Sequence, residues 1–172
     1  MIYKKILFLG RSKDKNSIKI LNKIKKNFKN VDVVWSKFKK QKISPKVFKK
    51  KFDLIISYRS YFILSQTLIN NSKLAINFHP GPPEHPGSCS ANWALYNHDS
   101  EFGVTAHFMN DLVDNGLIFR VRRFPINRED SLDDLLDKAN IEVLLLFQEV
   151  VKDMTTTWKG KARTGKDLDK LI

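Results

Sequence analysis

Cysteine is almost absent from this chain, because Cys89 is the only one among its 172 residues. An internal disulfide is therefore excluded, and so is a zinc site built from several cysteine ligands. Long apolar runs are also lacking, since no segment approaches the ~20 apolar residues that a membrane-spanning helix needs. The apolar stretch at residues 6–9 is too short for a signal peptide. We therefore expect a cytoplasmic protein without a membrane span.

Acidic residues are scarce in the first third of the chain. Residues 1–52 contain 18 Lys or Arg and 2 Asp or Glu, a balance of +16, whereas residues 53–172 contain 13 and 16, a balance of −3. Arg11 is the only arginine in that first third. Base readout and paired phosphate contacts favour Arg over Lys. We interpret the basic region as solvated surface and do not expect nucleic acid as a partner, with polyanion binding as the open alternative.

Short apolar segments alternate with helical patterns in the first half of the chain. Strands are expected at residues 2–9, 31–35, 54–57 and 74–77, and helices at residues 17–28, 45–51 and 65–70. The buried face of the first helix is predicted from Ile18, Leu21, Ile24 and Phe28, which recur every three or four residues. This alternation predicts an α/β fold, a Rossmann-like, mostly parallel twisted sheet with helices on both faces.

The second half continues with a helix at about residues 91–96 and strands at residues 104–109 and 117–124. Ser131 is a candidate N-cap for a helix that extends to about Met154. We expect one domain, residues 1–154, followed by a polar tail, residues 155–172.

The most informative stretch is Asn77-Phe78-His79, at the end of the fourth expected strand. Ligands of parallel sheets bind beyond the carboxyl ends of the strands. Side chains two residues apart on an extended chain point to the same side, so an amide and an imidazole should face one site. Four prolines and two glycines follow in residues 80–87 and restrict the loop. About thirty residues later, the turn Asp114-Asn115-Gly116 could bring a carboxylate that orients His79 and raises its pKa.

These elements, with Gly103-Val104-Thr105 between them, resemble the pattern of the folate-dependent formyltransferases. That family includes glycinamide ribonucleotide transformylase, methionyl-tRNA formyltransferase and the sugar N-formyltransferases. The resemblance covers residues 52–126. It implies that Asn77, His79 and Asp114 are catalytic, that 10-formyltetrahydrofolate is the donor, and that no metal is needed.

The resemblance also implies that two loops bind the pterin of the donor. The matching residues are Ser57, Tyr58, Arg59, Tyr61, Phe62, Ile63, Asn110, Asp111, Leu112 and Val113. For the acceptor we expect contacts from the loop after the fourth strand, at Pro80, Gly81 and Pro82, and from Arg11. The segment around Arg11 lacks a glycine-rich phosphate fingerprint.

The expected reaction is transfer of a formyl group to the amino group of a nucleotide-linked amino sugar, through a tetrahedral intermediate. The segment at residues 57–63 resembles the sugar-modifying branch, and the chain has no room for the β-rich tRNA domain of methionyl-tRNA formyltransferases. Residues 158–172 could be the remnant of an accessory region, which leaves a homodimer open. The alternatives are another small amine, such as a purine precursor or an aminoacyl group, and a non-catalytic folate- or RNA-binding relative.

Five further residues are not in the predicted set of site residues. We expect His85 and His98 at the surface, and Cys89 and Trp93 packed. His107 either faces the site or only fills space.

Overall fold

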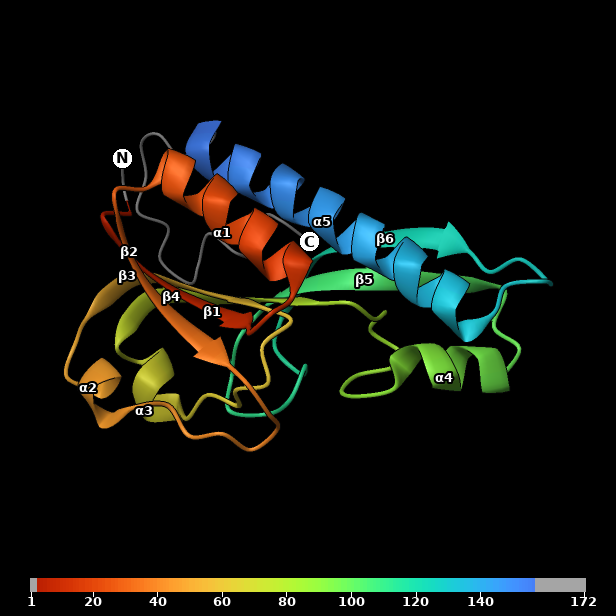
Figure 1. The fold of residues 1–172 in the computed structure, drawn as a ribbon, viewed down its shortest axis with the longest axis horizontal. Helices are drawn as coiled ribbons and strands as arrows, with labels where there is room; N and C mark the ends of the chain where they lie inside the picture. The colour runs from red at the N-terminus through yellow and green to blue at the C-terminus, as the bar shows by residue number, and fades with distance from the viewer. Residues whose placement is uncertain (1–2, 157–172) are drawn as a thin grey trace.

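The computed structural model describes residues 3–156, which form one six-stranded sheet with helices around it (Figure 1). The strands are β1 (Lys5–Arg11), β2 (Asn30–Ser36), β3 (Phe52–Tyr58), β4 (Ser72–His79), β5 (Glu101–Phe108) and β6 (Ile118–Pro125). The helices are α1 (Lys15–Asn27), α2 (Pro45–Phe48), α3 (Gln66–Ile69), α4 (Ser90–Tyr96) and α5 (Leu132–Thr156). Each element expected from the sequence is present, with ends that differ by a few residues. The expected tail starts within α5, and residues 157–172 lie outside the described part of the chain.

The strand order is β2-β1-β3-β4-β5-β6. Strands β1 to β4 are parallel, β5 is antiparallel to β4, and β6 is antiparallel to β5. Helices α1 and α5 lie side by side on one face, α2 and α3 lie on the other, and α4 sits beside the start of α5 (Figure 1). The expected α/β fold with a mostly parallel sheet is confirmed.

The larger core lies between the sheet and helices α1 and α5. It contains six buried aromatic side chains, and the rings of Phe78 and Phe147 lie 5.1 Å apart, edge to face. The smaller core lies under α2 and α3, where Leu64 and Leu68 pack against β1 and β3. Burial of each such side chain contributes about 1.5–3 kcal/mol. The two cores hold both faces of the sheet and leave its carboxyl edge for a site.

Helix α1 starts at an acidic cap. The Asp14 carboxylate accepts a hydrogen bond from the Ser17 amide at 2.7 Å. The buried stripe consists of Ser17, Ile20, Leu21 and Ile24. The prediction that Ile18 lies on this stripe is wrong, since Ile18 is 45% exposed. Ser17 occupies the inner position instead, and its hydroxyl accepts a hydrogen bond from the Arg11 amide.

Strand β4 continues two residues further than expected and ends at His79. Asn77 and His79 therefore alternate with the core residue Phe78 and share the other face of the sheet. The antiparallel pairing sets His107 opposite Asn77 and Thr105 opposite His79. One strand pair thus brings four polar side chains to one patch of the sheet.

The segment between β5 and β6 turns tightly back on β5. Asp114 adopts a left-handed backbone conformation with φ of 48°, which Asp tolerates better than most residues. Gly116 lies so close to β5 that an added Cβ would be 1.6 Å from the Phe108 carbonyl oxygen. The close approach of Gly116 thus positions Asp114 over the sheet.

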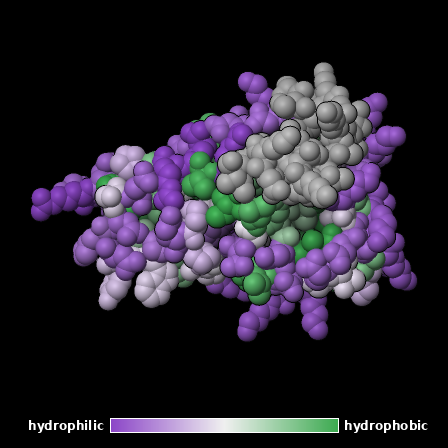
Figure 2. Space-filling model, turned by 180° about the vertical axis from the view of Figure 1, so that it is seen from behind, coloured by the Kyte–Doolittle hydropathy of each residue, from purple (hydrophilic) through white to green (hydrophobic). Residues whose placement is uncertain are grey.

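Several side chains expected to be packed are at the surface. Cys89 is exposed, and Trp93 is 56% exposed, with its ring against that of Tyr96 at 6.0 Å. Both predictions are wrong because α4 buries mainly its small side chains, Ala91 and Ala94. On the face shown in Figure 2, hydrophilic side chains surround a smaller hydrophobic area. Among residues 3–156, no helix has the length and apolar character needed to cross a bilayer.

The first prediction concerns Gly116. Replacement by alanine would force Cβ into a backbone carbonyl, so we expect Gly116→Ala to lower the free energy of unfolding by about 2 kcal/mol or more. Gly87→Ala is the control, because Gly87 has a positive φ of 82° but open space around it. It should cost only about 1 kcal/mol. Urea denaturation of both variants measures this, and equal losses would contradict the role of the close approach.

Candidate active site

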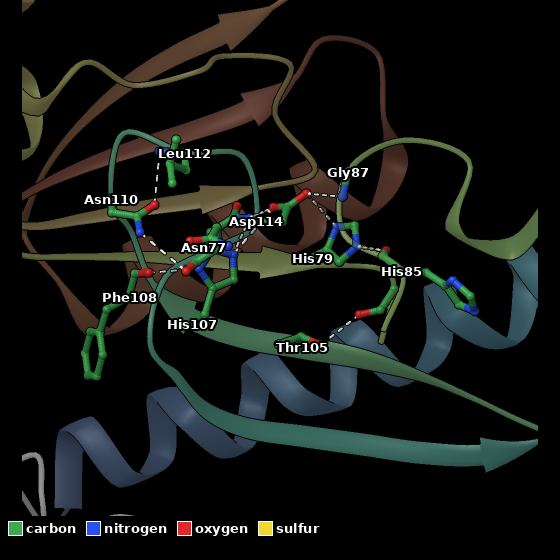
Figure 3. Close-up of polar contacts among 12 residues, drawn as sticks. Asn77, His79, His85, Gly87, Thr105, His107, Phe108, Asn110, Leu112 and Asp114 are labelled. Carbon is green, nitrogen blue, oxygen red and sulfur yellow. Dashed lines mark hydrogen bonds and ion pairs between the residues drawn. The ribbon is translucent and has the colours of Figure 1, made fainter. Parts of the chain in front are cut away.

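The Asp114 carboxylate lies at the centre of a polar cluster (Figure 3). One oxygen accepts a hydrogen bond from Asn77 Nδ2 at 2.8 Å, and the other lies 3.2 Å from His79 Nδ1. The Gly87 amide donates to that second oxygen at 3.1 Å. Burial acts to raise the pKa of Asp114, but His107, the charge of His79 and the Gly87 amide together hold this pKa below its usual value. Asp114 is therefore a carboxylate at neutral pH.

His79 faces an oxygen acceptor with each ring nitrogen. Nδ1 lies near Asp114, and Nε2 lies 3.2 Å from the His85 carbonyl oxygen. Both contacts favour the protonated ring, but the side chain is only 8% exposed. Burial outweighs the opposing contacts with Asp114 and His85, so the pKa of His79 is lowered, with His107 adding to the decrease. The expected rise in this pKa is wrong, although Asp114 does act in the expected direction.

His107 faces the site and fixes the amide of Asn77. Its Nδ1 donates to the Phe108 carbonyl oxygen at 2.8 Å. Its Nε2 lies 3.1 Å from Asn77 Nδ2 and 3.5 Å from Asp114 Oδ1. Asn77 Nδ2 also donates to Asp114, so the amide oxygen points away from that carboxylate. The alternation of Thr105 and His107 on β5 was the sequence signal for this role.

The loop that follows β4 folds back over His79. Thr105 donates its hydroxyl hydrogen to the Gly81 carbonyl oxygen at 2.8 Å. Gly81 has no room for a side chain, because an added Cβ would lie 2.4 Å from His79 Nε2. The glycine therefore allows the loop to close over the imidazole.

The cluster opens into a cavity of about 580 Å³ along the carboxyl edge of the sheet. Its mouth carries large apolar side chains that are unusually exposed: Ile63 at 66%, Leu112 at 60% and Val113 at 50%. They belong to the loops after β3 and β5, the two segments predicted to bind the pterin. A cavity with apolar walls and a few convergent polar groups is the usual form of a small-molecule site.

The other end of the cavity is cationic. Arg11 is the last residue of β1 and Arg59 follows β3, on adjacent strands, and Lys39 lines the same cavity. The Arg11 guanidinium lies 4.3 Å from the Tyr61 ring centre, and its Nε donates to the Arg59 carbonyl oxygen at 3.3 Å. Burial, and then the charge of Arg59, lower the pKa of Arg11. The Asp14 carboxylate lies 3.7 Å from Arg59 Nε.

Most of the predicted site residues line this one cavity. They are Arg11, Ser57, Arg59, Tyr61, Phe62, Ile63, Asn77, His79, Pro80, Leu112, Val113 and Asp114. Five others do not line it: Tyr58, Gly81, Pro82, Asn110 and Asp111.

Each of the five has a different place. Tyr58 is fully buried in the core, because its position in β3 points it away from the face that carries Ser57. Gly81 and Pro82 are buried within the loop after β4, and Asp111 is exposed. Asn110 holds the Asp114 segment by accepting a hydrogen bond from the Leu112 amide. Direct ligand contacts by the side chains of these residues are not supported.

Several residues of the cavity wall were not among the predicted site residues, and two of them carry amide side chains. Asn92 on α4 and Asn140 on α5 line the cavity, with amide groups that can donate and accept hydrogen bonds. No local pattern distinguishes them, since only the packing of α4 beside α5 brings them to one wall. Within residues 3–156, no group of three or more His, Cys, Asp or Glu is arranged to hold a metal ion.

Comparison with known proteins agrees with this geometry. The family model described as "Formyl transferase" matches residues 4–150. The chain belongs to this family. The Asn77, His79 and Asp114 cluster lies entirely within the matched region.

Relatives in the family act on different acceptors. The chain is 30% identical over 117 residues to a GDP-perosamine N-formyltransferase from Brucella melitensis, covering 66% of this chain and 45% of that protein. It is 32% identical over 129 residues to a methionyl-tRNA formyltransferase from Ehrlichia chaffeensis, covering 66% and 43%. The chain thus spans less than half the length of either relative.

Solved structures show the same fold. An N-formyltransferase from Helicobacter canadensis, in complex with folinic acid and dTDP-3-aminofucose, superposes with a TM-score of 0.75 at 20% identity, covering 90% of this chain and 65% of that one. A phosphoribosylglycinamide formyltransferase from Bacillus halodurans gives 0.72 at 18% identity, covering 90% and 97%.

The second prediction concerns the protonation of His79. Its titration, followed by NMR of the imidazole, should give a pKa below the ordinary value of about 6.5. In Asp114→Asn this pKa should fall further, because the attraction of the carboxylate for the imidazolium is lost. A rise in the pKa of His79 in the variant would contradict the proposed balance of burial and charge.

Proposed function

We propose that the chain transfers a formyl group from 10-formyltetrahydrofolate to the amino group of a nucleotide-linked amino sugar. One observation carries this proposal above the others. The Asp114 carboxylate contacts both His79 and Asn77 at the floor of a cavity with an apolar mouth and a cationic end. This combination of groups supports a folate donor, a proton carrier and an anionic acceptor.

The donor fits the apolar end of the cavity. Ile63, Leu112 and Val113 offer exposed surface on which a flat pterin ring can lie, and the backbone groups of their loops can hydrogen-bond its edge. Folinic acid in the Helicobacter canadensis complex supports a donor of the folate class. When bound, 10-formyltetrahydrofolate supplies the formyl group as an activated amide.

The residues of the cluster move the proton. The lowered pKa leaves His79 neutral at neutral pH, so the ring can take up the proton that the attacking amine loses. Because Nδ1 faces Asp114 and Nε2 faces the His85 carbonyl oxygen, a water held by Asp114 relays this proton to the ring. Asp114 then stabilises the imidazolium through Nδ1 and keeps the ring in place. His79 can return the proton to the leaving nitrogen, so no covalent bond to the protein is required.

Asn77 is the expected hydrogen-bond donor to the oxygen of the tetrahedral intermediate. Its Nδ2 contacts both Asp114 and His107 in this structure. To stabilise the oxyanion, the amide must exchange one of these bonds for the formyl oxygen. We expect the bond to His107 to be the one that is exchanged, because the hydrogen bond to the Asp114 carboxylate is the stronger of the two.

The acceptor is assigned from the cationic end. Arg11 and Arg59 both line the cavity, and the buried Arg59 Nε lies 3.7 Å from the Asp14 carboxylate, which holds the side chain in place. Guanidinium groups bind phosphate oxygens well. The sugar N-formyltransferase relatives support an amino sugar that carries a nucleoside diphosphate.

A second candidate is an acceptor amine carried on a polyanion. Residues 37–51 contain eight lysines and no acidic residue, and Lys39 reaches the cavity wall. Methionyl-tRNA formyltransferases are also among the relatives. If this candidate is correct, acceptor affinity should fall steeply with salt, with a slope set by the number of phosphate contacts.

The third prediction tests donor and acceptor. We expect 5-formyltetrahydrofolate, a stable analogue, to bind in calorimetry. A panel of nucleotide-linked amino sugars incubated with 10-formyltetrahydrofolate should yield one product with a formyl mass gain, whereas methionyl-tRNA should not react. Folate binding without any formylated sugar would exclude the acceptor class, and absence of folate binding would exclude the donor.

The fourth prediction concerns the cluster as a unit. His79→Ala and Asp114→Ala should each lower turnover severely, and Asn77→Ala should lower it by roughly 10²–10³ through loss of an oxyanion donor. Because the three act together, the His79→Ala/Asp114→Ala double variant should be nearly as active as the worse single variant. Turnover and folate affinity of these variants measure this. Near-normal turnover of His79→Ala with folate bound would show that the imidazole only supports the loop.

A further inference from the structure

A second histidine–carboxylate pair lies behind the active-site loop. His85 Nε2 is 2.6 Å from Asp99 Oδ2, which is a short, strong contact. The His85 side chain is only 12% exposed, so the prediction that it lies free at the surface is wrong. The Asp99 amide donates to the Ala94 carbonyl oxygen of α4 at 3.0 Å. Asp99 therefore has a fixed backbone from which to hold the loop.

His85 is also the residue whose backbone touches the catalytic imidazole. Its carbonyl oxygen lies 3.2 Å from His79 Nε2 (Figure 3). Its amide closes a turn by donating to the Pro82 carbonyl oxygen at 3.1 Å. One residue thus links the Asp99 carboxylate, through its side chain, to the His79 ring, through its carbonyl group.

The other restraints on this loop act elsewhere. Glu84 pairs with Arg123 of β6 at 2.6 Å, and Thr105 holds the Gly81 carbonyl. The Gly87 amide contacts Asp114 from the other side of the ring. Among the described residues, these contacts set the path of the loop, but none is made by the residue that contacts Nε2.

We propose that His85 and Asp99 form a positioning pair, which holds the His85 carbonyl oxygen against Nε2 of His79 and fixes the catalytic ring in line with Asp114. The inference rests on the proposed formyl transfer for its kinetic effect, but its structural effect on His79 is independent of any ligand. His85 and Asp99 contact no residue of the cavity floor through their side chains, so they act only through the loop.

The groups around His79 and His85 determine how the pKa of His79 should change when the pair is broken. His79 faces Asp114 and His107 in addition to the His85 carbonyl. His85 faces Asp99, with Glu84, Glu101 and Arg123 around the same hollow. Of the contacts with His79, those from Asp114 and the His85 carbonyl favour the imidazolium. Loss of the carbonyl contact should lower the pKa of His79, because only Asp114 then offsets burial.

The test is Asp99→Asn, which removes the charge but keeps the shape. We expect the NMR titration of His79 to move to lower pH, and the limb of the kcat/KM profile that reports this ring to move with it. We expect kcat to fall about tenfold, because a misplaced catalytic group loses rate without losing ligand contacts. The Kd of 5-formyltetrahydrofolate should stay within about twofold, because the apolar loops that bind it are unchanged.

Three matched variants complete the test. Asp99→Glu keeps the carboxylate, so its His79 pKa and its kcat should both stay close to those of the unchanged protein. Glu84→Gln breaks the neighbouring ion pair of the same loop and should leave the pKa of His79 unchanged. His85→Gln combined with Asp99→Asn should be no worse than the worse single variant, since both break one unit.

Two results would overturn the positioning pair. One is an unchanged His79 titration in a folded Asp99→Asn protein, and the other is an equal shift in Glu84→Gln, which would mean that any loosening of the loop has this effect. If Asp99→Asn does not fold, His85→Gln provides the same titration. Because the NMR readout needs no turnover, a failure of the proposed formyl transfer would be visible separately, as absence of product with every acceptor.

Discussion

The contact of one carboxylate with two side chains of β4 is the constraint on which the site depends. Asp114 lies in a loop, 37 residues after Asn77 in the sequence. It can lie over the sheet only because its backbone is left-handed and Gly116 presses against β5. The carboxylate then orients the amide, orients the imidazole and supplies the charge that a buried imidazolium needs.

The chemistry follows from an opposition between burial and charge at His79. A ring with 8% exposure resists protonation, whereas Asp114 and a carbonyl oxygen favour it. The result is a neutral ring that is already surrounded by the groups that stabilise its protonated form. A general base that is to receive a proton transiently requires such surroundings. The same cavity is lined by exposed apolar side chains, Ile63, Leu112 and Val113, and by the guanidinium groups of Arg11 and Arg59.

The sequence predicted the parts that depend on local pattern. Apolar periodicity gave the elements and the sheet class, and the Asn77 and His79 spacing gave one face of β4. The end of β4 was missed because polar residues at the end of a strand look like a loop. The approach of Arg11 to Arg59 depends on strand order, which no local pattern contains. Trp93 was misplaced because exposure depends on what packs against a helix.

The order of the strands has a consequence for how the protein is made. The parallel half, β1 to β4, is synthesised first and carries Asn77 and His79 on what is then the outer strand of the sheet. The antiparallel pair β5 and β6 both covers that strand, which would otherwise offer unpaired backbone groups to other chains, and delivers Asp114 and His107. A nascent chain that folds from its amino terminus therefore completes the cluster of Asn77, His79 and Asp114 in the same step in which the edge of β4 is covered.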